Sequence, residues 1–218
     1  MKLNTDMTAY YGRRAASYEQ VYAKAERQQD LPIMREWLRT TLSGHRVLEL
    51  ACGTGYWTAE IAQVAASIHA TDLHDAMVDI AKTKVPPSDN VSFAIADAFT
   101  LSIDATNTPF SAVFAGFFWS HVRREEQDRL MQNLRTQVGK DALLVLLDSV
   151  YVEGSSTSIA RTDLQGNTFQ IRLLDGERFE VLKNFPTDSA LRKRLGPHLK
   201  DIRIRRLDHY WMLSGRLK

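Results

Sequence analysis

Residues 47–58, VLELACGTGYWT, pass from an apolar run through Glu49 into a Gly-x-Gly pair. Glycines allow tight turns and a close approach of the backbone to a ligand, because no Cβ intervenes. Gly53 and Gly55 could also form a turn without a ligand. However, a carboxylate, Asp72, follows Gly53 by nineteen residues and could accept both hydrogen bonds of a ribose diol. The combination favours an adenosine-like ligand at this loop.

Paired glycines also occur in two kinds of phosphate-binding loop, the P-loop and the dinucleotide-binding loop. A P-loop requires Gly-Lys-Ser/Thr, which this stretch lacks. A dinucleotide loop requires a third small residue three positions after the second glycine, and here Thr58 stands there behind the bulky Trp57. The residues therefore exclude the first loop and disfavour the second.

These residues need elements that bring them together, and the hydrophobic pattern predicts alternating strands and helices. Strands are expected at 46–52, 67–73, 91–98, 110–118 and 142–150, with helices at 56–66, 75–84 and 124–138. Two closing strands are expected at 202–207 and 209–217. This order predicts an α/β fold with a doubly wound, mostly parallel, seven-stranded sheet. Ligands bind such sheets at the carboxyl ends of the strands.

The flanking segments complete one predicted domain, 1–218. Residues 1–42 form a helical cap, broken near Pro32, and 43–150 form the core. An inserted hairpin occupies 151–186, where Asp175-Gly176 is a turn signal that pairs Leu174 with Glu177 and Arg172 with Phe179. Residues 187–218 hold a last helix, capped by Thr187 or Asp188, and the strand pair.

Composition indicates a globular, cytoplasmic protein. The hydrophobic content is 44%, the charged content is 25% and the formal net charge is +2, too small to indicate a polyanionic partner by itself. One cysteine excludes an internal disulfide. No signal-peptide pattern and no apolar run long enough to cross a bilayer is present, and no metal site is predicted.

VLELACGTGYWT resembles motif I of the class I S-adenosylmethionine-dependent methyltransferases, with Glu49, Gly53 and Gly55 at its diagnostic positions. The resemblance extends through IADAF (95–99) and FSAVFAGFFWSHV (110–122), although Ser111 stands where many relatives carry aspartate. YYGRRAASYE, WSHV and LLDGERFEVLKNF are similar to small-molecule members of secondary metabolism, such as the phosphonate O-methyltransferase of dehydrophos biosynthesis.

The resemblance implies a Rossmann-like fold and S-adenosylmethionine as cofactor, released as S-adenosylhomocysteine. It implies the following cofactor-binding residues: Tyr11, Arg14, Tyr18, Glu49, Ala51, Gly53, Thr54, Gly55, Trp57, Asp72, Leu73, Met77, Asp97, Ala98, Phe99 and Gly116. In this set Asp72 contacts the ribose, Asp97 and its neighbours face the adenine, and Arg14 pairs with the methionine carboxylate. Trp57 could cover the cofactor or pack in the core, and Arg14 could lie on a solvated helix.

The residues expected around the methyl acceptor are His121, Arg172, Lys183 and Trp119. A neutral hydroxyl or a protonated amine would need a base, and His121 is the candidate because its unperturbed pKa lies near neutrality. A structural histidine bonded to a loop carbonyl is the alternative. A phosphonate or carboxylate needs no base, only cationic donors, which Arg172 and Lys183 on the hairpin could supply.

The sequence therefore predicts a methyltransferase of a small anionic metabolite, with O-methylation of a phosphonate or carboxylate first and N-methylation second. A nucleic-acid substrate is the remaining class, because seven basic residues lie between 192 and 206. The alternation in IRIRR turns its arginines outward as a solvated face and argues against that class. A module that binds the cofactor without catalysis has no specific support, and the oligomeric state is not predicted.

Overall fold

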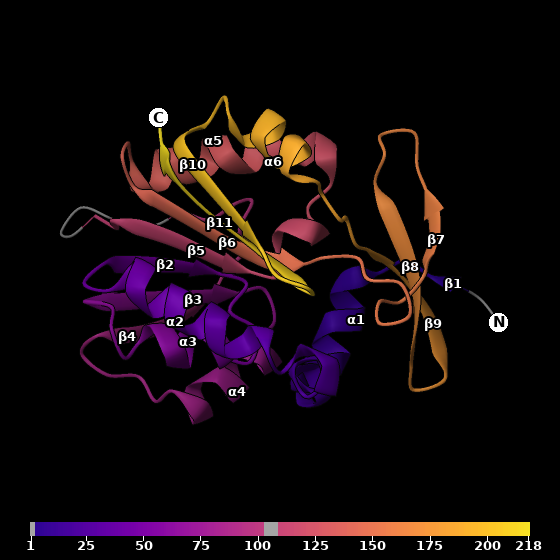
Figure 1. Ribbon diagram of the computed structural model, residues 1–218. Helices are drawn as coiled ribbons and strands as arrows, with labels where there is room; N and C mark the ends of the chain where they lie inside the picture. Colours follow the sequence, from indigo (N-terminus) through magenta and orange to yellow (C-terminus); the bar gives the residue numbers. More distant parts are fainter. Residues whose placement is uncertain (1–2, 103–108) are drawn as a thin grey trace.

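The computed structural model describes residues 3–102 and 109–218 and contains a central seven-stranded sheet (Figure 1). Its strands lie in the order β10-β11-β6-β5-β2-β3-β4. They are β2 (Arg46–Leu50), β3 (Ser67–Asp72), β4 (Val91–Ile95), β5 (Ala112–Gly116), β6 (Leu143–Ser149), β10 (Leu199–Arg206) and β11 (Tyr210–Leu217). Only β11 runs antiparallel to its neighbours, β6 and β10. The predicted doubly wound, mostly parallel sheet is confirmed.

Helices cover both faces of this sheet (Figure 1). They are α2 (Asp30–Leu42), α3 (Tyr56–Ile61) and α4 (Asp75–Lys84) on one face, and α5 (Gln127–Val138) and α6 (Asp188–Leu195) on the other. Side chains alternate between the two faces of a strand. In β2, Val47 packs with α2 and α3, while Leu48 and Leu50 pack with α5 and α6. The buried strand therefore forms part of two hydrophobic cores.

The N-terminal cap is α1 (Met7–Arg14) followed by two 3₁₀ segments, η1 (Ala15–Tyr22) and η2 (Ala25–Arg27). Asp6 caps α1 by accepting a hydrogen bond from the backbone N–H of Ala9 at 2.9 Å. The predicted break near Pro32 lies at residues 28–29, between η2 and α2. Pro32 itself lies in the first turn of α2, where a missing N–H costs no helical hydrogen bond.

A second, four-stranded sheet has the order β1-β9-β8-β7. Its strands are β1 (Leu3–Asn4), β7 (Ile159–Thr162), β8 (Thr168–Leu174) and β9 (Glu177–Leu182). The predicted hairpin is confirmed in register, because Leu174 pairs with Glu177 and Arg172 with Phe179. Both turn residues have positive φ, 50° at Asp175 and 76° at Gly176, as a tight hairpin turn requires. Strands β1 and β7 were not predicted, since β1 is two residues long and β7 is exposed on every residue.

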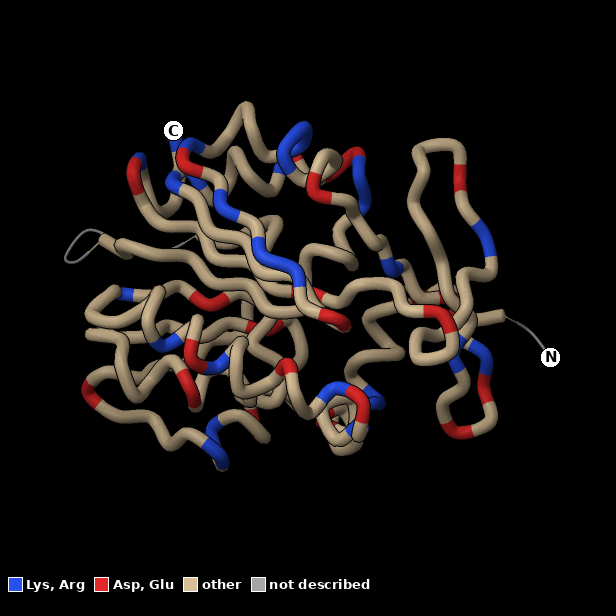
Figure 2. Tube along the Cα trace, in the orientation of Figure 1, with Lys and Arg blue, Asp and Glu red and all other residues tan. Residues whose placement is uncertain are grey.

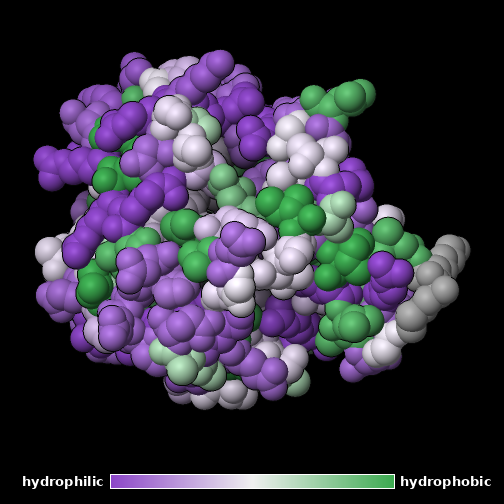
Figure 3. Space-filling view, turned by 45° about the vertical axis from the view of Figure 1, so that its right-hand side comes forward, coloured by the Kyte–Doolittle hydropathy of each residue, from purple (hydrophilic) through white to green (hydrophobic). Residues whose placement is uncertain are grey.

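Surface charge agrees with the expected solvated face of β10 (Figure 2). Arg203, Arg205 and Arg206 are exposed, while Ile202 and Ile204 pack against the core. Hydrophobic side chains gather instead over the four-stranded sheet (Figure 3), where Leu164 and Leu173 are largely exposed. Among the described residues, no helix has the length and apolar character needed to cross a membrane.

Candidate active site

The glycine loop joins β2 to α3 at the carboxyl edge of the large sheet. Gly53 and Gly55 adopt φ values of 56° and 76°, which side-chain-bearing residues rarely adopt. The N–H of Gly53 donates to the Asp72 carboxylate at 2.9 Å, so the end of β3 holds the loop in place. Ala51 and Phe117, directly after β2 and β5, also have positive φ (51° and 59°). Such backbone strain clusters at functional sites.

A cavity of about 290 Å³ opens beside this loop, here called the cofactor cavity. Its lining includes eleven of the residues predicted to bind the cofactor: Tyr11, Tyr18, Ala51, Gly53, Asp72, Leu73, Met77, Asp97, Ala98, Phe99 and Gly116. They come from the cap, from the segments at the carboxyl ends of β2, β3, β4 and β5, and from the first turn of α4. The lining carries two carboxylates, Asp72 and Asp97, and much of the remainder is apolar.

Five predicted cofactor residues do not line this cavity. Trp57 is 4% exposed in the core, and its indole N–H donates to the Tyr22 hydroxyl at 3.1 Å. Gly55 packs against Ala81 of α4, where an added Cβ would come within 3.0 Å of that backbone. Thr54 is buried, and its hydroxyl donates to Glu19 of the cap at 2.6 Å. Arg14 faces a different cavity, described below.

Glu49, the fifth, lies beneath the glycine loop rather than in the cavity. It is 1% exposed, and the Thr58 hydroxyl donates to its carboxylate at 2.7 Å. Burial raises the pKa of Glu49 to about 8, because a buried carboxylate loses its hydration. Glu49 thus connects β2 to α3 through Thr58 and stabilises the loop between them.

The sequence interpretation missed several residues of the cofactor cavity, namely Met7, Thr8, His74, Ala96, Phe117 and Phe118. His74 shows how they are placed. Its Nδ1 lies 3.1 Å from the Asp72 carboxylate, and its Nε2 lies 2.8 Å from the backbone carbonyl of Thr8. His74 thereby joins the cap to the end of β3. In the sequence, the only indication of this role was the position of His74 two residues after Asp72, the last residue of β3.

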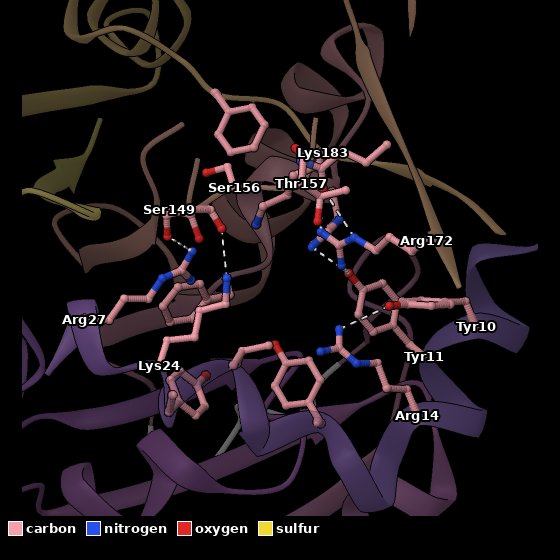
Figure 4. Close-up of a pocket in the computed structure, with 18 of the residues that line it drawn as sticks. Tyr10, Tyr11, Arg14, Lys24, Arg27, Ser149, Ser156, Thr157, Arg172 and Lys183 are labelled. Carbon is pink, nitrogen blue, oxygen red and sulfur yellow. Dashed lines mark hydrogen bonds between the residues drawn. The ribbon is translucent and has the colours of Figure 1, made fainter. Parts of the chain in front are cut away.

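A second cavity, of about 380 Å³, lies between the cap, the carboxyl end of β6 and the hairpin (Figure 4). We call it the acceptor cavity. Its lining includes five basic residues: Arg14, Lys24, Arg27, Arg172 and Lys183. No aspartate or glutamate is among the residues that line it. The predicted pair Arg172 and Lys183 is thus brought together, and Arg14, Lys24 and Arg27 are added by the cap.

Arg172 is held by neutral partners. Its Nε and one terminal nitrogen donate to the Gln170 side-chain oxygen at 3.2 and 2.7 Å, and the other terminal nitrogen lies 3.5 Å from the Tyr11 hydroxyl. The guanidinium also lies 5.9 Å from the centre of the Tyr10 ring. A guanidinium keeps its charge at any physiological pH. Its positive charge therefore remains available to a ligand.

Lys183, the second cation predicted on the hairpin, is buried directly after β9. It is 6% exposed, and its Nζ donates to Asp148 at 2.8 Å and to the Ser120 hydroxyl at 2.7 Å. Burial lowers the pKa of Lys183, and the Asp148 carboxylate opposes that shift. An ammonium has three donors, so one remains for the acceptor cavity.

Three arginines of the acceptor cavity have no acidic partner. Within residues 3–102 and 109–218, neither Arg14, Arg27 nor Arg172 forms an ion pair, whereas Lys183 pairs with Asp148. Arg14 lies over the rings of Tyr10 and Tyr18, at 5.8 and 5.6 Å. Unpaired charges in a partly closed cavity are costly unless a ligand compensates them.

His121 lies on η3 (Trp119–His121), and both its ring nitrogens have partners. The Nδ1 lies 2.6 Å from the Leu182 carbonyl, which can only accept, so Nδ1 carries the proton. The Nε2 then accepts from the Tyr11 hydroxyl at 2.9 Å. Burial, with a contribution from the Lys183 charge, lowers the pKa of His121 to about 3. The imidazole is therefore neutral near pH 7 and fixes the position of Tyr11.

Four residues line both cavities: Tyr11, Tyr18, Phe117 and His121. The two cavities therefore adjoin at these side chains, and a group passing from one ligand to the other must cross there. Trp119, predicted to contact the acceptor, lines neither of these two cavities. It is 3% exposed and packs in the core with α5 and α6.

Comparison with known proteins agrees with this geometry. Residues 47–141 match a family described as a methyltransferase domain. The chain is 28% identical over 151 residues to an uncharacterized methyltransferase of Bacillus licheniformis, an alignment that covers 68% of this chain and 66% of the relative. A 67-residue segment is 39% identical to the magnesium-protoporphyrin O-methyltransferase of Rhodobacter capsulatus and covers 30% of each protein. The chain thus aligns with less than two thirds of the length of either relative.

Solved structures are similar over almost the whole chain. A complex of DhpI with SAH is 25% identical with a TM-score of 0.77, covering 96% of this chain and 94% of that one. A DhpI–SAM–HEP complex is 24% identical with a TM-score of 0.79, covering 96% and 95%. The match of residues 47–141 to a methyltransferase domain, and the similarity of fold to complexes that hold SAH and SAM, agree with the geometry of the glycine loop and Asp72.

Proposed function

We propose that this protein transfers a methyl group to an anionic oxygen, a phosphonate or carboxylate, of a small metabolite. The observation that carries the proposal is the acceptor cavity, which contains three arginines that form no ion pair with any described acidic residue. A guanidinium binds phosphonate or carboxylate oxygens through paired, charge-assisted hydrogen bonds. DhpI, with a similar fold, has been crystallised with SAM and HEP. The lining charge disfavours the alternative acceptor, a protonated amine.

The cofactor cavity fits the proposed donor. An added Cβ on Gly53 would have Tyr18 as its only neighbour within 4 Å, at 3.9 Å, so the loop leaves room on the side of the cap. Asp72 lies where it can accept from a ribose, and Leu73, Met77 and Phe99 offer apolar contact to an adenine. When bound, S-adenosylmethionine supplies a methyl on a cationic sulfur, which retains the electron pair as the acceptor oxygen takes the methyl.

The residues of the chain then have to align the acceptor oxygen and exclude water. Arg172 and the third donor of Lys183 orient the anion, and Tyr11 and Tyr18 close the passage between the cavities. Positioning of this kind supplies much of the acceleration of an in-line displacement. No proton needs to be removed from an anionic oxygen. The neutral His121, with its pKa near 3, accordingly acts in this proposal by positioning Tyr11 and not as the predicted base.

The proposal is tested by Arg172→Gln in a radiolabelled methyl-transfer assay against phosphonates, carboxylates, amines and bulk tRNA. We expect wild type to methylate anionic acceptors and the variant to raise their KM at least tenfold, since it loses one charge-assisted contact of about 2 kcal/mol. The matched control is Arg178→Gln, an exposed arginine of the same hairpin, which should behave as wild type.

Calorimetry with S-adenosylhomocysteine tests cofactor binding separately from recognition of the anionic acceptor. Both variants should bind it as wild type does, because neither residue lines the cofactor cavity. Methylation of amines or tRNA alone would overturn the anionic acceptor. Wild-type kinetics in Arg172→Gln would overturn the role assigned to that arginine.

A further inference from the structure

Four of the five basic residues of the acceptor cavity fall into two groups on opposite sides (Figure 4). Arg14 and Arg172 lie beside Tyr10 and Tyr11, and Arg172 contacts the Tyr11 hydroxyl, which also borders the cofactor cavity. Lys24 and Arg27 lie across the cavity from them. Their side chains contact Ser155 and Tyr210, neither of which lines the cofactor cavity.

The second group contains polar atoms whose bonding capacity is not used. Tyr210 is 1% exposed and lines the acceptor cavity; burial raises the pKa of its hydroxyl, and the adjacent Arg27 guanidinium opposes that shift as a charged, hydrogen-bonding neighbour. The Nε of Arg27 is buried without a partner of normal geometry among the described residues, although a terminal nitrogen donates to Ser155 at 3.3 Å. Buried polar groups are nearly always satisfied, so such atoms indicate an absent partner.

Each of these groups can donate a hydrogen bond to an anion. Arg27 and Lys24 can only donate, and the Lys24 ammonium uses one of its three donors on the Ser155 carbonyl at 2.8 Å. Glu26 lies 4.0 Å from Lys24, accepts from the Ser155 hydroxyl and does not line the cavity. A set of donors with net positive charge selects an anion.

We propose that the acceptor carries two anionic groups. One is held by Arg172 and the third donor of Lys183 for methylation, and the second is held across the cavity by Lys24, Arg27 and the Tyr210 hydroxyl. This inference rests on the proposed function and narrows its substrate class to small metabolites with an anion at each end. The second group fixes the length and orientation of the acceptor and takes no part in the chemistry.

The test compares acceptors that differ only at the second end. Binding of 3-phosphonopropionate and butylphosphonate, and of glutarate and pentanoate, is measured by calorimetry on protein saturated with S-adenosylhomocysteine. Wild type should bind each two-ended compound at least tenfold more tightly than its one-ended partner. Arg27→Gln should abolish that ratio and Arg27→Lys should retain part of it. Arg205→Gln, an exposed arginine on β10, should leave it unchanged.

Tyr210→Phe distinguishes binding from structural support. Its hydroxyl contacts the Arg27 guanidinium, so its removal should lower the Tm of the unliganded protein by no more than the loss of one hydrogen bond does. The preference for two-ended compounds should nevertheless fall. Equal wild-type affinities within each pair, or a ratio unaffected by Arg27→Gln and Tyr210→Phe, would overturn the second anion site and leave the proposed function intact. Failure of wild type to bind any of the four anions would overturn both.

Discussion

At the scale of single residues, the environment of His121 decides what it can do. A histidine that follows a strand at the carboxyl edge of the sheet is a candidate general base, and the ordinary pKa of an imidazole would suit that role. Burial beside Lys183 lowers the pKa to about 3, and both nitrogens are already bonded. The same residue type thus becomes a neutral acceptor that orients Tyr11.

A pH profile tests this assignment. Because His121 stays neutral at every pH well above 3, kcat with a carboxylate acceptor should be flat between about pH 6 and pH 9. His121→Phe should lower kcat/KM about fivefold to tenfold, the equivalent of one neutral hydrogen bond, without changing the shape of the profile. Titration of the acceptor itself would appear equally in both proteins. An acid limb near pH 6–7 that is present in wild type and absent in the variant would show that His121 is a base.

At the scale of elements, the loop between β2 and α3 combines a required backbone conformation with open space. Gly53 needs φ of 56° and is tied to Asp72, while Gly55 packs tightly on α4. Glu49 supports the loop from below through Thr58. Gly53 is therefore the position where an added methyl would meet the ligand before it met the protein.

Gly53→Ala and Gly44→Ala form a matched pair. Both glycines have positive φ, 56° and 71°, so each alanine should lower the free energy of unfolding by about 1–2 kcal/mol. Gly44 has no atom within 4 Å of an added Cβ and lies outside the cofactor cavity. Only Gly53→Ala should also weaken binding of S-adenosylhomocysteine, measured by calorimetry. Equal affinities in the two variants would contradict the close approach at Gly53.

At the scale of the whole molecule, the cap connects the two sheets. Arg13 pairs with Glu177 of the hairpin at 2.5 Å, and β1 pairs with β9. On the other side, Glu19 accepts from Thr54 of the glycine loop and pairs with Lys84 of α4. Both ligand cavities are therefore partly enclosed by one N-terminal segment.

Hydrogen exchange tests the consequence for ligand binding. S-adenosylhomocysteine should slow exchange of amides in residues 7–22, because Tyr11 and Tyr18 line its cavity. At a hundredfold excess over Kd, the free energy of cap opening should rise by up to about 2.7 kcal/mol. Residues 188–206, in α6 and β10, serve as the internal control. Protection restricted to the glycine loop would show that the cap does not respond to the cofactor.

The sequence by itself determined the large sheet, the glycine loop, Asp72 and the register of the hairpin, because each depends on local periodicity or turn chemistry. Strand alternation sets which side chains face the core, and Asp175-Gly176 sets the pairing. Only the tertiary structure decided that Lys183 is neutralised by Asp148, that Trp119 and Trp57 are core residues, and that Lys24 and Arg27 border the acceptor cavity. Burial and charge pairing depend on residues far apart in the chain, and local sequence patterns do not report which of those residues meet.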